Sequence, residues 1–135
     1  MTYLLDTNAC IRVLNGSCAE LVERLRGHDP ASILISTIVK AELLFGARRS
    51  ARVDSNLRLL ERFFEPFATA HFDDVCAEHY ALIRADLARM GTPIGPNDML
   101  IAATARARDA VLVTANSAEF RRVVGLRLVN WEVED

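Results

Sequence analysis

Short apolar runs alternate along the chain with longer segments in which apolar residues recur every three or four positions. The short runs predict β-strands, and the longer segments predict amphipathic α-helices. Strands are expected at residues 2–5, 33–35, 68–72, 111–114 and 126–130. Helices are expected at residues 8–14, 19–26, 38–49, 54–64, 74–90, 98–108 and 117–121. This alternation predicts an α/β fold in which a central parallel sheet of about five strands lies between two layers of helices.

Capping residues mark the ends of several predicted helices. Thr37 and Asn97 are placed to cap the helices that follow them, and Asp73 or Asp74 can cap the long helix that runs to Met90. Gly91 is expected to close that long helix, because glycine adopts the left-handed conformation found at helix ends.

Three acidic residues interrupt or adjoin apolar stretches where a carboxylate is costly to bury. Asp6 ends the first predicted strand, Glu42 lies within an apolar helix, and Asp98 precedes Met-Leu-Ile. An isolated buried carboxylate is destabilising unless hydrogen bonds or a cation compensate its charge. If the three converge, a divalent metal is the simplest way to relieve their mutual repulsion. The chain is therefore a candidate metal-dependent enzyme.

The predicted topology brings these residues to one edge of the sheet. Asp6 and Asn116 follow the carboxyl ends of two strands, and helices that run back along a parallel sheet begin at that same edge. Asp98 in the first turn of its helix, and Glu42 in the second turn of another, are expected there too. The helix N-terminus is also expected to favour the ionised form of Asp98.

An all-oxygen donor set favours Mg²⁺ or Mn²⁺ over Zn²⁺. Asp6 and Asp98 are expected to bind the ion directly. Glu42 is expected either to bind the ion through a water or to act as a ligand and a base. The ion would polarise a phosphate and lower the pKa of a bound water. Thr114 and Asn116 would orient the water or the ligands. His28, His71 and His79 form no ligand pattern.

Each of these residues also has a purely structural interpretation. Asp6 can cap the next helix, Asp98 can be a first-turn carboxylate placed for the helix dipole, and Glu42 can pair with Arg49 or Lys40. Thr114 and Asn116 suit an ordinary turn at the end of a strand. These interpretations weaken together, because chance does not send all of these residues to the functional edge of one sheet.

Composition narrows the class of protein. A length of 135 residues predicts one domain, residues 1–135. The three cysteines lack metal-ligand spacing and are expected to be reduced thiols, with Cys10 and Cys76 in the core. No signal peptide or membrane span is predicted, and a cytoplasmic protein without a membrane partner is expected.

Basic residues are almost all arginine. Lys40 is the only lysine, and the net charge is −2, which argues against binding nucleic acid through bulk charge. Arginine binds phosphate through a planar fork of donors, so individual side chains remain candidates for phosphate binding. The candidates are Arg48, Arg49, Arg52, Arg84, Arg89 and Arg106. A codon bias towards arginine and a solvated helix face are the competing explanations.

Four segments together resemble the PIN-domain ribonucleases, most closely the VapC toxins of bacterial toxin–antitoxin pairs. Their sequences, in order, are LLDTN at 4–8, STIVKAELLFGA at 36–47, GTPIGPNDMLIA at 91–102 and VTANSAEF at 113–120. The closing strand, LVNW at 128–131, is similar as well. The resemblance spans essentially the whole chain and implies a PIN-like fold.

The fourth segment departs from the commonest family pattern, in which an aspartate follows the threonine after one residue. Asn116 stands at that position, and Glu119 three residues later is able to supply the missing carboxylate. The resemblance thus gives Asp6, Glu42, Asp98, Thr114, Asn116 and Glu119 as candidate catalytic residues. It leaves the occupancy of a second metal site open.

The resemblance implies an endoribonuclease toxin, with structured RNA, tRNA in particular, as the expected substrate. It also implies a homodimer and a VapB-like antitoxin whose C-terminal segment covers the acidic cleft. Helices 38–49 and 57–64 are the expected docking and dimer surfaces, with burial in the core as the alternative. Two other functions stay open: a metal-dependent phosphatase or DNA nuclease, and a catalytically silent module that binds a basic partner.

Overall fold

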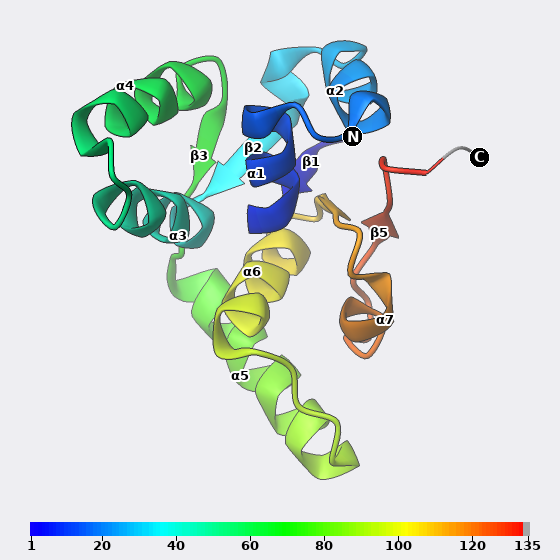
Figure 1. Ribbon diagram of the computed structural model, residues 1–135. Coiled ribbons are helices and arrows are strands. Elements are labelled where there is room, and N and C mark those ends of the chain that lie inside the picture. The colour runs from blue at the N-terminus through cyan, green and yellow to red at the C-terminus, as the bar shows by residue number, and fades with distance from the viewer. Residues whose placement is uncertain (134–135) are drawn as a thin grey trace.

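The computed structural model describes residues 1–133 and is built around one parallel sheet with strand order β3-β2-β1-β4-β5 (Figure 1). The strands are β1 (Tyr3–Leu5), β2 (Ile33–Ser36), β3 (Ala68–Ala70), β4 (Val111–Val113) and β5 (Leu128–Val129). The helices are α1 (Thr7–Asn15), α2 (Ala19–Arg26), α3 (Thr37–Arg48), α4 (Val53–Phe64), α5 (Asp74–Met90), α6 (Pro96–Ala107) and α7 (Ser117–Phe120).

This architecture confirms the predicted α/β fold with its parallel sheet. Every predicted strand and helix is present, with ends that differ by a few residues. A short 3₁₀ helix, Pro30–Ser32, was not predicted. No helix within residues 1–133 is both long and apolar enough to cross a membrane.

Two predicted helix caps are wrong. Ser36, not Thr37, caps α3: the Ser36 hydroxyl accepts a hydrogen bond from the Val39 amide at 3.0 Å. Helix α6 begins after Gly95, with Pro96 rather than Asn97 at its start. Proline suits the first helical position because it lacks an N–H group that would have no partner there.

The chain reverses its direction across the sheet between β1 and β4. From β1 it proceeds outwards through β2 to β3, then crosses back to β4 on the other side of β1 and continues to β5. Crossovers between parallel strands are right-handed, so the outward and return connections lie on opposite faces. Sheets of this type bind ligands outside the carboxyl ends of the two strands where the order reverses, here β1 and β4, and this region is called the crevice below.

Apolar side chains from all layers fill the core. Leu4, Leu5, Ile35 and Leu112 from the central strands are fully buried. All three cysteines are free thiols, and the predicted burial of Cys10 and Cys76 is confirmed.

The segment after β5 packs back over the amino end of the fold. Trp131 is buried and stacks on His28, with ring centroids 4.5 Å apart, and it also contacts Tyr3. The Arg24 side chain donates a hydrogen bond to the Asn130 carbonyl at 3.2 Å. These contacts fix the last strand and the residues that follow it against α2.

The cap of α3 gives a test of local stability. Ser36→Ala removes the acceptor for the Val39 amide inside the fold, so it should lower the free energy of unfolding by about 1 kcal/mol in urea titrations. Thr37→Ala is the matched control, because the exposed Thr37 hydroxyl makes only a long 3.4 Å bond to the Ala70 carbonyl. A larger loss for Thr37→Ala than for Ser36→Ala would contradict this assignment.

Candidate active site

Asp6 and Thr114 lie side by side where the strand order reverses. Leu5 of β1 pairs with Val113 of β4, so the next residue of each strand sits at the same level of the sheet. The Asp6 amide continues the ladder by donating to the Val113 carbonyl at 3.1 Å. Both side chains are buried, with 5% of Asp6 and 1% of Thr114 exposed.

Two hydrogen bonds orient the Asp6 carboxylate. Its Oδ1 accepts from the Ala9 amide at 2.8 Å, which makes Asp6 the N-cap of α1, and the Thr114 side chain is a second partner. Burial nevertheless raises the pKa of Asp6 above its ordinary value, against the opposite effect of these two bonds. The predicted cap is therefore present, and the cap residue also lies in the acidic crevice.

Glu42 approaches the same crevice from the second turn of α3. Its Oε1 accepts a hydrogen bond from the Thr7 hydroxyl at 2.8 Å, which ties it to the residue after Asp6. The alternative pairing with Lys40 or Arg49 is wrong. The Lys40 ammonium bonds the Thr69 hydroxyl at 2.5 Å, and the Arg49 guanidinium lies over the Phe45 ring.

Asp98 and Glu119 complete the group of acids from the other side. Asp98 is in the first turn of α6, as predicted, and it shares a hydrogen bond with Glu119 of α7. Glu119 is held at both oxygens: Oε1 accepts from the Gly95 amide at 3.0 Å, and Oε2 accepts from the Asn116 side chain. The Asn116 amide in turn donates to the Thr114 hydroxyl at 2.9 Å.

Burial and like charge raise the pKa of Asp98 to about 6. Burial is the largest cause, followed by the negative charges of Glu119, Glu42 and Asp6. The helix N-terminus is expected to favour the ionised form of Asp98, but burial and three neighbouring acids outweigh that effect in the absence of a cation. Glu119, Glu42 and Asp6, from three other segments of the chain, therefore all lie near enough to Asp98 to act on its charge.

The donor chemistry of this group suits a hard divalent cation. The converging side chains offer carboxylate oxygens. The Thr114 hydroxyl and the side-chain carboxamide of Asn116 lie beside them. Within residues 1–133, no three His, Cys, Asp or Glu side chains are already drawn close enough together to bind an ion. Mg²⁺ does not require such a cage, since it typically takes one or two carboxylates and keeps several waters.

Four of the six arginines proposed for phosphate binding make contacts within the protein, and Arg49 over the Phe45 ring is one of them. Arg84 donates to the Tyr80 hydroxyl at 2.8 Å, and Arg89 pairs with Asp86. Arg106 bonds His79 Nδ1 at 2.8 Å and the Val124 carbonyl at 2.9 Å, so it fastens the loop after α7 to α5. Arg48 and Arg52 are exposed.

Sequence reasoning missed an ion pair beside the acidic crevice. Arg12 on α1 pairs with Glu132, which lies 120 residues away in the sequence, and both charges act on Asp6. Thr7 and Gly95 were also missed as partners of Glu42 and Glu119. Both belong to the segments quoted above, but nothing in the sequence says which acid each one contacts.

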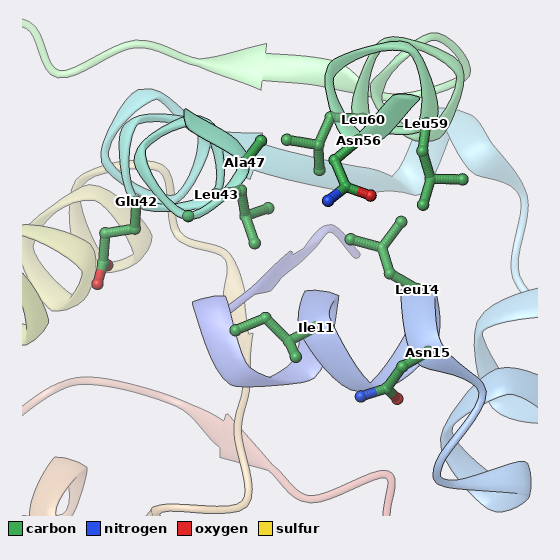
Figure 2. Close-up of a pocket in the computed structure, with 10 residues that line it drawn as sticks. Ile11, Leu14, Asn15, Glu42, Leu43, Ala47, Asn56, Leu59 and Leu60 are labelled. Carbon is green, nitrogen blue, oxygen red and sulfur yellow. The ribbon is translucent and has the colours of Figure 1, made fainter. Parts of the chain in front are cut away.

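An apolar groove extends away from Glu42 between α1, α3 and α4 (Figure 2). It has a volume of about 290 Å³. Ile11 and Leu14 of α1 face Leu59 and Leu60 of α4 across it, with Leu43 of α3 between them (Figure 2). Ile11 and Leu59 are about two-fifths exposed, so this apolar surface is open to solvent.

The sequence and the fold both match known proteins. The PIN domain model matches residues 3–126. The tRNA(fMet)-specific endonuclease VapC of Shigella flexneri is 38% identical over 97% of this chain and 98% of its own length. The chain belongs to the VapC ribonucleases of the PIN-domain family.

Solved structures agree with this membership. VapBC2 of Rickettsia felis bound to a DNA fragment from its promoter superposes with a TM-score of 0.91 and 36% identity, covering 97% of this chain and 99% of the matched one. The DNA-bound VapBC of Salmonella typhimurium gives a TM-score of 0.91 and 37% identity, with coverage of 97% and 98%. The resemblance stated from the sequence is confirmed, and membership selects a ribonuclease, the toxin of a VapBC system, among the functions left open.

The raised pKa of Asp98 predicts how stability depends on pH when no metal is present. The folded state holds the Asp98 proton more tightly than the unfolded chain does, so this contribution is present below about pH 4 and is lost as the pH rises through about 6. Asp98→Asn should remove this fall in stability with rising pH, because asparagine does not ionise. The variant should gain about 1–2 kcal/mol over wild type between these pH values, after allowance for solvent screening.

Urea titrations in EDTA at a series of pH values measure this difference. Asp54→Asn is the matched control, because Asp54 is an exposed first-turn residue of α4, away from the crevice. A stability difference between Asp98→Asn and wild type that stays constant from acid to neutral pH would refute the coupling.

Proposed function

We propose that this chain is a Mg²⁺-dependent endoribonuclease that cleaves tRNA, with Mn²⁺ as an alternative ion. The observation that supports the metal requirement is the convergence of Glu119, Glu42 and Asp6 on Asp98, whose pKa is raised first by burial and then by these three charges. The name of the Shigella flexneri relative supports tRNA as the substrate. Initiator tRNA is therefore the first substrate to test.

We assign the direct metal ligands to Asp6 and Asp98. Asp6 is fixed by the Ala9 amide and by Thr114, and Asp98 is fixed by its place at the start of α6. Glu42 reaches the crevice on a longer side chain held at one oxygen, which suits binding through a water or accepting a proton from one. When bound, Mg²⁺ supplies charge that polarises the scissile phosphate and makes a water more acidic.

Glu119 and Asn116 act by position in this proposal. Both Glu119 oxygens accept hydrogen bonds, and one of the donors is the Gly95 amide just before α6. Glu119 therefore fixes the start of α6, the helix that carries Asp98. Its negative charge also adds to the repulsion that a cation would relieve. Asn116 links Glu119 to Thr114 and so connects the two sides of the crevice.

The groove beside Glu42 is proposed as the docking site of a VapB-like antitoxin. An apolar segment of the antitoxin would bury Ile11 and Leu59, and a basic side chain at its end would compensate the acids that Mg²⁺ otherwise neutralises. A second hollow of about 270 Å³ beside Phe45 and Leu100 is proposed as the homodimer surface. Phe45 is 61% exposed, which leaves an aromatic face to cover. We further propose that residues 1–135 act as one domain in the cytoplasm, where tRNA and antitoxin are present.

Loss of one direct ligand should abolish cleavage without unfolding the protein. Asp6→Asn and Asp98→Asn should each reduce RNA cleavage with Mg²⁺ by at least about 100-fold, because the charge stabilisation that a metal provides amounts to several kcal/mol. Sequencing of RNA ends after brief induction, with Asp54→Asn as the control, measures the loss and identifies the RNA that is cut. Cleavage at the wild-type rate by Asp98→Asn would overturn the proposed site.

A paired experiment should distinguish the roles of the two apolar surfaces, antitoxin binding at the groove and dimerisation at the hollow beside Phe45. Leu59→Asp places a charge in the groove and should weaken antitoxin binding at least about tenfold, while leaving the mass of the toxin dimer unchanged. Phe45→Asp should do the reverse, giving a monomer that still binds antitoxin. Calorimetry and light scattering of the purified proteins measure the two effects. Equal antitoxin affinity for Leu59→Asp and wild type would show that the groove is not the docking site.

A further inference from the structure

A third pocket, separate from the groove beside Glu42 and the hollow beside Phe45, lies at the same edge of the sheet, between α7 and β5. It has a volume of about 360 Å³ and is lined by Ser117, Arg121, Leu126, Leu128, Val129 and Asn130. Half of these residues are apolar, and the other three, Ser117, Arg121 and Asn130, have side chains that can form hydrogen bonds. Apolar side chains combined with a few polar groups are typical of a small-molecule or base-binding site.

This pocket is joined to the acidic crevice by one residue of β4. The Thr114 side chain bonds Asp6 in the crevice, and the Thr114 amide donates to the carbonyl of Val129, a pocket residue, at 3.0 Å. Neighbouring strands lie about 4.8 Å apart, so β5 is about two strand spacings from β1 and Asp6. The pocket is therefore close enough to the crevice for neighbouring parts of one RNA strand to occupy both.

Helix α7 divides its side chains between the two sites. Asn116 and Glu119 bond each other on the side of the crevice. Ser117 and Arg121 are four positions apart, share a helix face and line the pocket. The helix and its flanking residues thus supply carboxylate to one site and guanidinium to the other.

The charges of the two sites differ in a way that fits one ligand. The crevice carries Asp6, Glu42, Asp98 and Glu119, which repel a polyanion unless a metal is bound. Arg121 is exposed, and no hydrogen bond or ion pair of its side chain is found among residues 1–133. Its fork of donors is available for a ligand that arrives beside the crevice.

We propose that this pocket binds an unpaired RNA base next to the cleaved bond, with Arg121 as the residue that recognises it. The inference rests on the ribonuclease function proposed above and adds a substrate-binding site to it. Sequence-specific contacts to RNA are made mainly to unpaired bases, which stack on or bond to arginine planes. The apolar side chains of Leu126, Leu128 and Val129 take the face of the base, and Arg121, Ser117 and Asn130 meet its polar edge.

Binding without cleavage tests this site independently of catalysis. Two labelled RNA hairpins are compared by fluorescence anisotropy with Ca²⁺ in place of Mg²⁺, so that a cation compensates the acids of the crevice: one hairpin has a mixed-sequence loop, and the other has the same loop lacking its bases. Wild type should bind the base-bearing loop about tenfold more tightly, the scale of a good arginine–base contact. Arg121→Ala should lose that preference. Arg121→Lys, which keeps the charge without the fork, should lose most of it.

Arg58→Ala is the matched control, because Arg58 is also exposed but lies on α4, on the opposite side of the sheet. It should keep the preference for loop bases. If Arg121→Ala weakens both hairpins equally, Arg121 contacts phosphate alone and the base site is wrong. Equal binding of both hairpins by wild type, or no binding of either, also overturns it.

The proposed function is tested by a separate measurement, tRNA cleavage by the wild-type protein. Wild type that cuts no tRNA with Mg²⁺ or Mn²⁺ would overturn the ribonuclease mechanism, whatever the hairpins show. Wild type that cuts tRNA while Arg121→Ala keeps the base preference would leave that mechanism standing and remove only the pocket.

Discussion

Repulsion among carboxylates at the end of two neighbouring strands is the constraint on which the functional architecture depends. The parallel register of β1 and β4 places Asp6 beside Thr114, and helices that start at the same edge bring in Glu42 and Asp98. Folding therefore buries Asp98 and gathers like charges around it, and both effects raise its pKa, burial the more strongly. In the proposed mechanism, a cation that compensates these charges would both stabilise the fold and activate the site.

The same residues serve structure and site. Asp6 caps α1 while it faces the crevice, and Thr114 accepts the turn bond from Asn116 while it contacts Asp6. Glu119 holds the start of α6 while it adds charge to Asp98. A structural role therefore does not compete with the proposed functional one, because the local bond holds the side chain at the crevice where the proposal places it.

The features of the fold and site that follow from the spacing of apolar residues and the order of strands and helices could be predicted from the sequence. The edge rule for parallel sheets was enough to expect Asp6, Glu42 and Asp98 together. Ser36 and Thr37 are adjacent and equally able to cap a helix, so the sequence could not choose between them. The pKa of Asp98 depends on distances between side chains of separate segments, and the Arg12–Glu132 pair joins the two ends of the chain. Neither leaves a local signal in the sequence.

Anomalous scattering from a crystal of the protein soaked in Mn²⁺ tests the central claim most directly. This account predicts one strong peak between the carboxylates of Asp6 and Asp98, which disappears in Asp98→Asn. A peak elsewhere on the surface, or an undiminished peak in the variant, would contradict it.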